Sequence, residues 1–392
     1  MSEPMPSPLT SQSGRFVQTA SAPEGVINFA LGQPSPRLLP LAQISEAAAA
    51  QLRPDADPLV LQYGALRGYA DFRASLATYL GEEYAQPVHP DELLVTGGTS
   101  SALTLVSEIF AGPGATVISE DPTYFLAHGV FRTAGLEVRS VPVDAQGLDV
   151  AALEELLAGG LCPAFVYCIP AFQNPTGVSL APARARRLVE LAERHDFVII
   201  ADEPYVALRW KGARPGSLTQ FDQGRGRVLS LGSFSKLLAP GLRLGWAHGA
   251  PALIERLSQH GALRSGGCLN PVIANLVHHV IDTGGLARNV AALREVFGGR
   301  SRALATALRK HLPQLSFIEP EGGYFCWVDL GEGRDSAALL EHAPALRWLP
   351  GQRCAVGRDL GRFARLSFSF YEAHELEAGV AALAELLGEY PG

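Results

Sequence analysis

The sequence predicts an α/β protein in which a mostly parallel sheet lies between helices and a smaller α+β unit follows. Short apolar runs at residues 164–169, 197–201 and 228–231 have the length and composition of strands. Strands that are apolar throughout are typical of parallel sheets buried on both faces. Helical patterns alternate with these runs, as expected for a sheet assembled from strand–helix–strand units.

The segments before the first of these runs follow the same rhythm. Residues 1–24 are rich in Ser and Pro and indicate a mobile arm. Apolar side chains recur at helical spacing between residues 71 and 80, which predicts an amphipathic helix. A strand at 92–95, a Gly-Gly turn and a helix at 99–110 come next. A further helix at 181–194 separates two of the apolar runs.

A different pattern begins near Leu286. A long Arg-rich helix precedes two extended segments at 320–330 and 364–370, and a final helix carries apolar residues at helical spacing from Leu376 onward. We therefore expect three parts. They are an N-terminal segment (1–40), a large domain (41–285) and a small C-terminal domain (286–392).

Charge and cysteine content exclude several classes of protein. Lys and Arg number 32 and Asp and Glu 39, so the net charge is −7; nucleic acids and anionic membranes attract basic surfaces, and we expect neither as a partner. No basic leader with an apolar segment and no apolar stretch of about 20 residues is present, which predicts a cytoplasmic protein. The five cysteines are odd in number and widely spaced, which favours buried free thiols over disulfides or zinc.

Lysine is scarce in this chain. Only Lys211, Lys236 and Lys310 supply primary amines, so chemistry that requires an amine has three candidates. Lys211 and Lys310 lie in polar surroundings typical of surface cations. Lys236 follows a predicted buried strand, which makes it the preferred candidate.

Polar residues gather where the predicted strands end. Ligands of open α/β sheets bind outside the carboxyl ends of the strands. The segments at these ends are Thr96 to Ser101, Gln173 to Gly177, Asp202 to Tyr205, Gly232 to Lys236, and Pro240 to Gly245. Glycines at a helix start suit a phosphate, because free N–H groups and the positive helix end point at it. A phosphate cradle, an amide, a carboxylate, a lysine and an arginine therefore converge on one edge.

Each residue taken singly has an ordinary structural explanation. Asn174 lies in a typical turn sequence, Asp202 is a possible helix cap, and Tyr124 is a possible packing aromatic. Ser233 and Ser235 suit a capping role, and most arginines are solvated surface groups. The order and spacing of the whole set favour a common function.

Taken together, these motifs resemble the class I/II aminotransferases, which are fold type I enzymes dependent on pyridoxal 5'-phosphate (PLP). The resemblance extends from NFALGQPSP (28–36) to the RLSFSF segment. The branch of 2-aminoadipate and kynurenine aminotransferases and MocR-like regulators is the most similar. The segments that carry it are LQYGALRGYADFR (61–73), IPAFQNPTG (169–177) and LGSFSKLLAPGLRLGW (231–246). The resemblance implies an aspartate aminotransferase-like fold with a seven-stranded, mostly parallel sheet in a PLP-binding large domain.

The resemblance also implies roles for individual residues. Lys236 matches the lysine that binds the cofactor and moves the substrate α-proton. Asp202 matches the carboxylate facing the pyridine nitrogen, and Tyr124 the aromatic stacked on the ring. Asn174 and Tyr205 match the hydrogen-bond partners of the phenolic oxygen. The implied phosphate ligands are Gly98, Thr99, Ser100, Ser233, Ser235 and Arg243.

Substrate and subunit contacts follow from the same resemblance. Arg365, with Asn174, matches the residue that holds the substrate α-carboxylate, for which a planar guanidinium is well suited. Gly32 lies in the segment that closes over the substrate in this branch. Tyr63 matches a tyrosine that reaches the phosphate of the other subunit, which implies a homodimer.

The chain departs from the family pattern at three places. Ser100-Ser101 replaces two glutamines, Cys354 replaces an aromatic residue, and NFALGQPSP differs from the usual closing segment. These positions lie where selection of the substrate side chain or closure over the substrate is expected, so the sequence does not identify the substrate. Arg37 is a candidate partner for a second substrate carboxylate, and an ordinary surface role fits it equally well.

The predicted function is transfer of an amino group from an α-amino acid to a 2-oxo acid, with 2-oxoglutarate as the expected acceptor, by a ping-pong mechanism. The alternatives are another PLP reaction, such as that of a lyase, decarboxylase or oxidase, and a MocR-like regulatory module. The segment before residue 28 is too short for a winged helix, which disfavours the regulator. Ser233 to Lys236 also fits the S-x-x-K motif of serine acylases, but the partner motifs S-D-N and K-T-G are absent.

Overall fold

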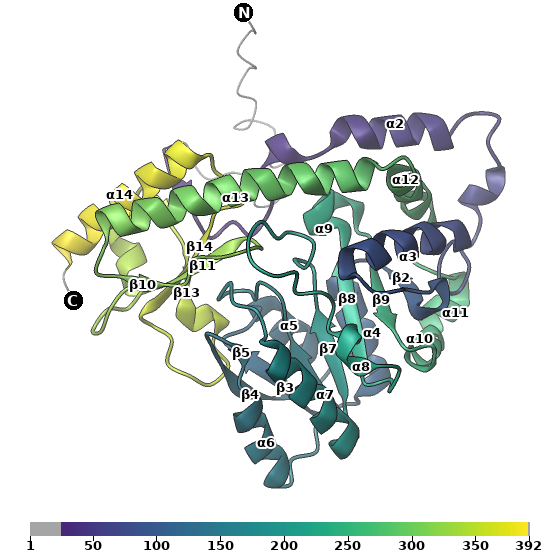
Figure 1. The fold of residues 1–392 in the computed structure, drawn as a ribbon, viewed down its shortest axis with the longest axis horizontal. Coiled ribbons are helices and arrows are strands. Elements are labelled where there is room, and N and C mark those ends of the chain that lie inside the picture. Colours follow the sequence, from purple (N-terminus) through teal and green to yellow (C-terminus); the bar gives the residue numbers. More distant parts are fainter. Residues whose placement is uncertain (1–24, 391–392) are drawn as a thin grey trace, which may run out of the picture.

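The computed structural model describes residues 25–390, in which an eight-stranded sheet, a four-stranded sheet and a two-stranded sheet are found (Figure 1). The large sheet has the order β2-β9-β8-β7-β6-β3-β4-β5. Neighbouring strands from β8 to β4 run parallel, whereas β9 is antiparallel to β2 and β8. Its strands are β2 (Leu93–Thr96), β3 (Thr116–Asp121), β4 (Glu137–Asp144), β5 (Gly147–Leu148), β6 (Phe165–Cys168), β7 (Val198–Asp202), β8 (Val228–Ser233) and β9 (Gly245–Gly249).

The predicted fold class is confirmed, with a small addition at one edge. Seven strands form the mostly parallel sheet, and the two-residue β5 pairs antiparallel with β4 as an eighth. The apolar runs at 164–169, 197–201 and 228–231 become β6, β7 and β8. All three strands are buried along their whole length, as their continuous apolar composition predicts.

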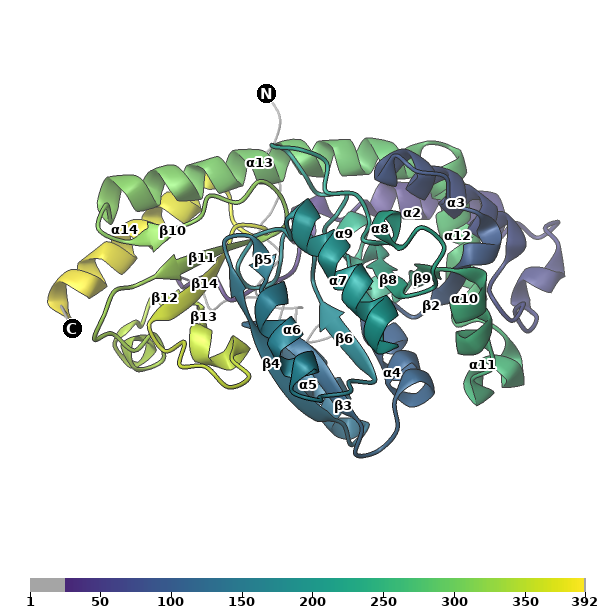
Figure 2. The same ribbon diagram turned by 60° about the horizontal axis from the view of Figure 1, so that its bottom comes forward.

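Helices cover both faces of this sheet (Figure 2). Tyr167 and Ile200 pack in one apolar cluster with α4 (Thr99–Phe110), α5 (Phe125–Thr133) and α10 (Pro251–Ser258). Val166 and Ile199 pack in another with α6 (Val150–Ala158) and α7 (Pro182–His195). Adjacent strand residues thus serve opposite faces, because side chains alternate along a strand.

The smaller sheet lies in the C-terminal part of the chain. Its order is β10-β11-β14-β13, and all its pairs are antiparallel. The strands are β10 (Ser316–Phe317), β11 (Phe325–Asp329), β13 (Leu349–Pro350) and β14 (Phe363–Ser367), and the long helices beside it are α13 (Gly285–His311) and α14 (Ala373–Glu389). In Figure 1, α13 runs above both sheets, and it contacts α14 at one end and α12 (Pro271–Asp282) at the other.

The N-terminal described segment joins the C-terminal part. Strand β1 (Ile27–Asn28) pairs with β12 (Leu346–Arg347), and the backbone N–H of Ser367 donates to the carbonyl of Phe29. Helices α2 (Leu41–Gln51) and α3 (Ala70–Tyr84) then pack on α12. The remaining short helices are α8 (Thr219–Asp222), α9 (Phe234–Leu237) and α11 (Gly261–Gly266). The boundaries at residues 40 and 285 stay predictions.

The predicted helices and the states of the cysteines can be compared directly with the structure. Helices predicted at 71–80, 99–110 and 181–194 correspond to α3, α4 and α7. Four cysteines are buried free thiols and Cys162 is exposed. Within residues 25–390, no helix is long and apolar enough to cross a membrane, and no cluster of His, Cys, Asp or Glu could hold a metal. The predicted mobile arm, 1–24, lies outside the described residues.

Candidate active site

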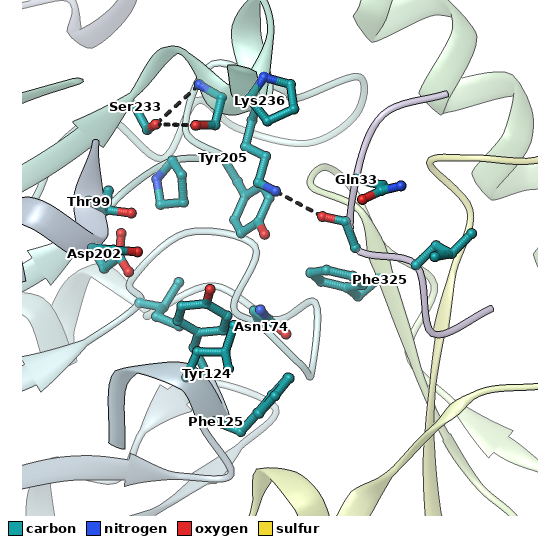
Figure 3. A pocket seen from close by; sticks show the side chains of 18 of the residues that line it. Gln33, Thr99, Tyr124, Phe125, Asn174, Asp202, Tyr205, Ser233, Lys236 and Phe325 are labelled. Carbon is teal, nitrogen blue, oxygen red and sulfur yellow. Dashed lines mark hydrogen bonds between the residues drawn. The ribbon is translucent and has the colours of Figure 1, made fainter. Parts of the chain in front are cut away.

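A cavity of about 710 Å³ opens at the carboxyl ends of the parallel strands and collects most of the predicted site residues. Figure 3 shows Thr99 and Asp202 at one end, Gln33 and Phe325 at the other, and Tyr124 across from Lys236. The predicted residues that line it are Gly32, Thr99, Ser100, Tyr124, Asn174, Asp202, Tyr205, Ser233, Ser235, Lys236, Arg243 and Arg365. Residues from the first forty positions and from the last forty therefore meet in one cavity.

Asp202 ends β7 and lines the cavity. Its Oδ2 accepts a hydrogen bond from the Tyr167 hydroxyl at 2.8 Å. Its Oδ1 is buried and has no hydrogen-bond partner in residues 25–390. Burial raises the pKa of this carboxyl to about 6, while the Tyr167 hydrogen bond opposes the rise. The carboxylate is therefore mostly ionised at neutral pH, and its Oδ1 can accept a hydrogen bond from a donor in the cavity.

Lys236 lies in the short helix α9, directly after β8. Its Nζ donates to the carbonyl oxygen of Gly32 at 2.8 Å (Figure 3). Burial lowers the pKa of the amine to about 8, and the positive charges of Arg365 and Arg243 contribute to the decrease. A substantial fraction is thus neutral near physiological pH, and only the neutral amine is a nucleophile or a base.

A site for an anion lies between the end of β8 and the start of α4. Gly98 directly precedes α4 and has a φ of +91°. Gly245 packs closely against it, because a Cβ added to Gly245 would lie only 2.8 Å from the Cα of Gly98. The Ser233 hydroxyl accepts from the backbone N–H of Ser235 at 3.1 Å and donates to its hydroxyl at 2.9 Å. Arg243 donates to the Gly97 carbonyl at 3.3 Å. Helix N–H groups, hydroxyls and a guanidinium thus converge on one spot.

Arg365, from β14, supplies a second cation on the opposite side. It donates to Asn174 Oδ1 at 2.8 Å and to the Ala30 carbonyl at 2.9 Å. Its guanidinium carbon lies 4.0 Å from the centre of the Phe325 ring, and its Nε is buried without a partner among the described residues. The guanidinium is therefore held in place on three sides and remains able to bind a carboxylate.

Tyrosines form the remaining wall. Tyr124 caps the start of α5 and Tyr205 follows β7, and burial raises the pKa of the Tyr124 hydroxyl to about 12. Burial raises the pKa of the Tyr205 hydroxyl as well. Both hydroxyls therefore stay protonated and can donate hydrogen bonds.

Two of the candidates, a tyrosine and an arginine, lie elsewhere. Tyr63 is 82% exposed and lines a separate hollow, so it contributes nothing to the cavity of its own chain. Arg37 forms an ion pair with Glu372 at 3.8 Å and does not line the cavity. This exposed ion pair agrees with a surface role for Arg37, and a role with a second substrate carboxylate stays a prediction.

Several residues of the site escaped the sequence analysis. Tyr167, which orients Asp202, lies inside an apolar strand, and nothing in its local pattern indicates a functional hydroxyl. Phe125 and Phe325 line the cavity but have the sequence pattern of packing aromatics. Asp121 accepts the backbone N–H groups of residues 356–358 and so ties the C-terminal loop to the end of β3. Only the strand order brings these groups together.

Known proteins share this fold and these motifs. The family model for aminotransferase class I and II matches residues 24–383. Aromatic-amino-acid aminotransferase 1 of Thermococcus litoralis is 34% identical over 371 residues, which cover 93% of this chain and 88% of the relative. This chain therefore belongs to the class I and II aminotransferases.

Solved structures support the same assignment. The kynurenine aminotransferase of Pyrococcus horikoshii, in complex with PMP, has a TM-score of 0.88 and 32% identity, and the match covers 94% of this chain and 92% of that one. The alpha-aminoadipate aminotransferase of Thermus thermophilus, complexed with N-(5'-phosphopyridoxyl)-L-leucine, has a TM-score of 0.83 and 33% identity, covering 93% of each chain. The chain is a PLP-dependent aminotransferase with the aspartate aminotransferase-like fold.

The cavity fits this cofactor. The unpartnered Asp202 Oδ1 suits a protonated ring nitrogen, and the anion site at Gly98, Ser233 and Arg243 suits a phosphate. Lys236, with its lowered pKa, supplies an amine in the same cavity. The cavity therefore offers a partner for the ring nitrogen of PLP, a site for its phosphate and an amine that can react with it.

Proposed function

We propose that this enzyme transfers the amino group of an α-amino acid to 2-oxoglutarate by a ping-pong mechanism in which Lys236 is the base. The observation that carries the proposal is the pairing, in one cavity, of the Lys236 amine and the unpartnered oxygen of Asp202. When bound, PLP supplies an electron sink for the pair of electrons released at the substrate Cα.

The protein's own residues position the reacting atoms. Arg365 would hold the substrate carboxylate with the guanidinium that Asn174 and Ala30 already orient. Lys236 would take the α-proton on Nζ and return it to a neighbouring carbon, for which its pKa of about 8 is well matched. Asp202 would keep a proton on the ring nitrogen through Oδ1, because a buried carboxylate strongly favours a positive partner.

Product release and the second half of the reaction would use the same residues. A 2-oxo acid presents the same carboxylate to Arg365, and Lys236 would then deliver the proton to Cα rather than remove it. Tyr124, Asn174 and Tyr205 would hold the cofactor ring, while Gly98, Thr99, Ser100, Ser233, Ser235 and Arg243 would hold its phosphate. The Gly32 carbonyl, now 2.8 Å from Lys236 Nζ, would give up that hydrogen bond.

We further propose a homodimer. Tyr63 lies beside Leu59 and Leu61 in an exposed apolar stretch, and such a stretch favours burial against a partner. Tyr63 would then reach the phosphate of the other subunit. Sedimentation of the holoenzyme would give the mass of two chains, and Tyr63→Phe would weaken PLP retention by about tenfold, as expected for one lost charge-assisted hydrogen bond. A monomer with full PLP affinity would contradict this arrangement.

A reducing, cytoplasmic location is proposed on the basis of the cysteines. The five free thiols in residues 25–390 form no disulfide, as expected in a reducing compartment. Cell fractionation would check this, and recovery of the protein outside the cytoplasm would contradict it.

The reaction itself has a direct test. The holoenzyme would be incubated with single amino acids and 2-oxoglutarate, and glutamate and the new 2-oxo acid would be measured. We expect equal amounts of both products and parallel lines in a double-reciprocal plot, as for ping-pong kinetics. Release of ammonia, carbon dioxide or hydrogen peroxide in place of glutamate would instead identify a lyase, decarboxylase or oxidase. A DNA mobility-shift assay would detect a regulatory role.

A further inference from the structure

Every cationic side chain of the described chain that lines the cavity already has a proposed role, so none remains for a second substrate carboxylate. Among its described lining residues only Lys236, Arg243 and Arg365 are cationic, and each already has a proposed role. An acceptor such as 2-oxoglutarate carries two carboxylates, of which Arg365 would bind one. The other needs a cation from just outside the lining.

Arg353 is placed to supply it. It belongs to the short 3-10 helix Gly351–Cys354, and its guanidinium carbon lies 5.5 Å from the centre of the Phe125 ring, which does line the cavity. The side chain is exposed, and its guanidinium forms no ion pair with a carboxylate of residues 25–390. It is thus a free cation at the rim, resting on an aromatic ring.

Arg353 and Arg365 come from one corner of the smaller sheet. Leu349 in β13 pairs with Arg365 in β14, and Arg353 follows four residues later. Both guanidinium groups act on the buried Cys354 thiol, opposing the effect of burial, which raises its pKa to about 11. Both cations therefore lie near the Cys354 thiol, one on β14 and one on the 3-10 helix that follows β13.

We propose that Arg353 binds the distal carboxylate of a dicarboxylic substrate, namely 2-oxoglutarate and the glutamate formed from it. This inference rests on the proposed function, since Arg365 must take the α-carboxylate first. A guanidinium fork suits a carboxylate, and its aromatic support reduces the freedom lost on binding. Phe125, beside Arg353, and Leu126 both line the cavity and would receive the side chain of an apolar amino donor.

The test compares two acceptors of equal length in Arg353→Met. With 2-oxoglutarate, kcat/KM should fall roughly tenfold or more, as expected for a lost hydrogen-bonded ion pair. With 2-oxopentanoate, which lacks the distal carboxylate, it should change by less than about twofold, because nothing then faces Arg353. Arg353→Lys should recover part of the loss with 2-oxoglutarate.

Arg37→Met is the matched control, because Arg37 is an exposed arginine already paired with Glu372. It should leave both acceptors unchanged. Equal losses with both acceptors in Arg353→Met, or no loss with either, would overturn the proposal. A selective loss in Arg37→Met would assign the distal carboxylate to Arg37 instead.

A binding measurement separates this inference from the proposed reaction. Calorimetry on the holoenzyme would compare glutarate with pentanoate, neither of which can accept an amino group. Arg353→Met should weaken glutarate roughly tenfold and leave pentanoate unchanged. If the wild type shows this selectivity but makes no glutamate, the proposed reaction fails while the carboxylate site stands. Equal binding of the two acids by the wild type would refute the site.

Discussion

The two walls of the cavity are built differently. On the cofactor wall, Asp202 and Ser233 are the last residues of neighbouring parallel strands, and Lys236 follows three residues later. On the substrate wall, Gly32 comes from the N-terminal segment, Asn174 from the loop after β6 and Arg365 from β14. The first wall is part of a buried sheet, whereas the second is assembled from three distant segments.

This difference predicts different effects of mutation. Groups on buried strand ends are already oriented before any ligand arrives, so their loss should reduce kcat and cofactor binding. Groups on the substrate wall orient carboxylates, so their loss should mainly raise KM. Single substitutions on each wall test this separation.

Lys236→Ala should have the largest effect. It removes the only primary amine among the described residues that line the cavity, so we expect kcat to fall on the order of 10³-fold or more and the absorbance of covalently bound cofactor to disappear. Absorbance spectra and steady-state rates would measure both effects. Lys211→Arg and Lys310→Arg are the controls, because Lys310 is exposed and pairs with Glu377. Retained covalent cofactor in Lys236→Ala would contradict the assignment.

Asp202→Asn should come next. The amide has a similar shape but no charge to hold a proton on the cofactor ring, so kcat should fall about 10²–10³-fold, the usual cost of removing one preorganised electrostatic group. KM for the amino acid should change little. Tyr167→Phe, which removes the hydrogen bond to Oδ2 alone, should cost far less. A large rise in KM with unchanged kcat would show that Asp202 belongs to the substrate wall.

Arg365→Lys should affect the substrate wall selectively. A lysine keeps the charge but loses the two-point contact, so kcat/KM should fall about 10- to 100-fold, mostly through KM. The PLP spectrum should stay unchanged, since Arg365 lies across the cavity from the anion site. Loss of cofactor in this variant would break the proposed separation of the two walls.

The rate at which the apoenzyme binds PLP should depend on pH through Lys236. Lys236 must be neutral to react, and its pKa is about 8, so the rate at which apoenzyme captures PLP should rise about tenfold per pH unit up to pH 8 and then level off. Asp202 favours the charged amine, so Asp202→Asn should move the midpoint to lower pH. A midpoint near the ordinary lysine value would show that the amine is solvated.

The sequence predicted that most residues of the cofactor wall meet at one edge of the sheet, and they line one cavity. Asp202, Ser233 and Lys236 each follow a continuous apolar run, and parallel strands place their carboxyl ends side by side. Tyr167 was missed because its role depends on the pairing of β6 with β7, which no local pattern indicates. The sequence also left open whether Arg37 meets a substrate, and the structure adds that Arg37 lies outside the cavity lining and pairs with Glu372.

The fold class, the order of the elements and the choice of Lys236 among three amines follow from the sequence alone. These depend on residue periodicity and on which residues follow each strand, and both are local properties. Three contacts become visible in the folded chain: Gly32 meets Lys236 across 204 residues, Arg365 meets Asn174 across 191, and Arg353 lies over Phe125. Such contacts depend on strand order and on how the two sheets pack, and neither is encoded in any single segment.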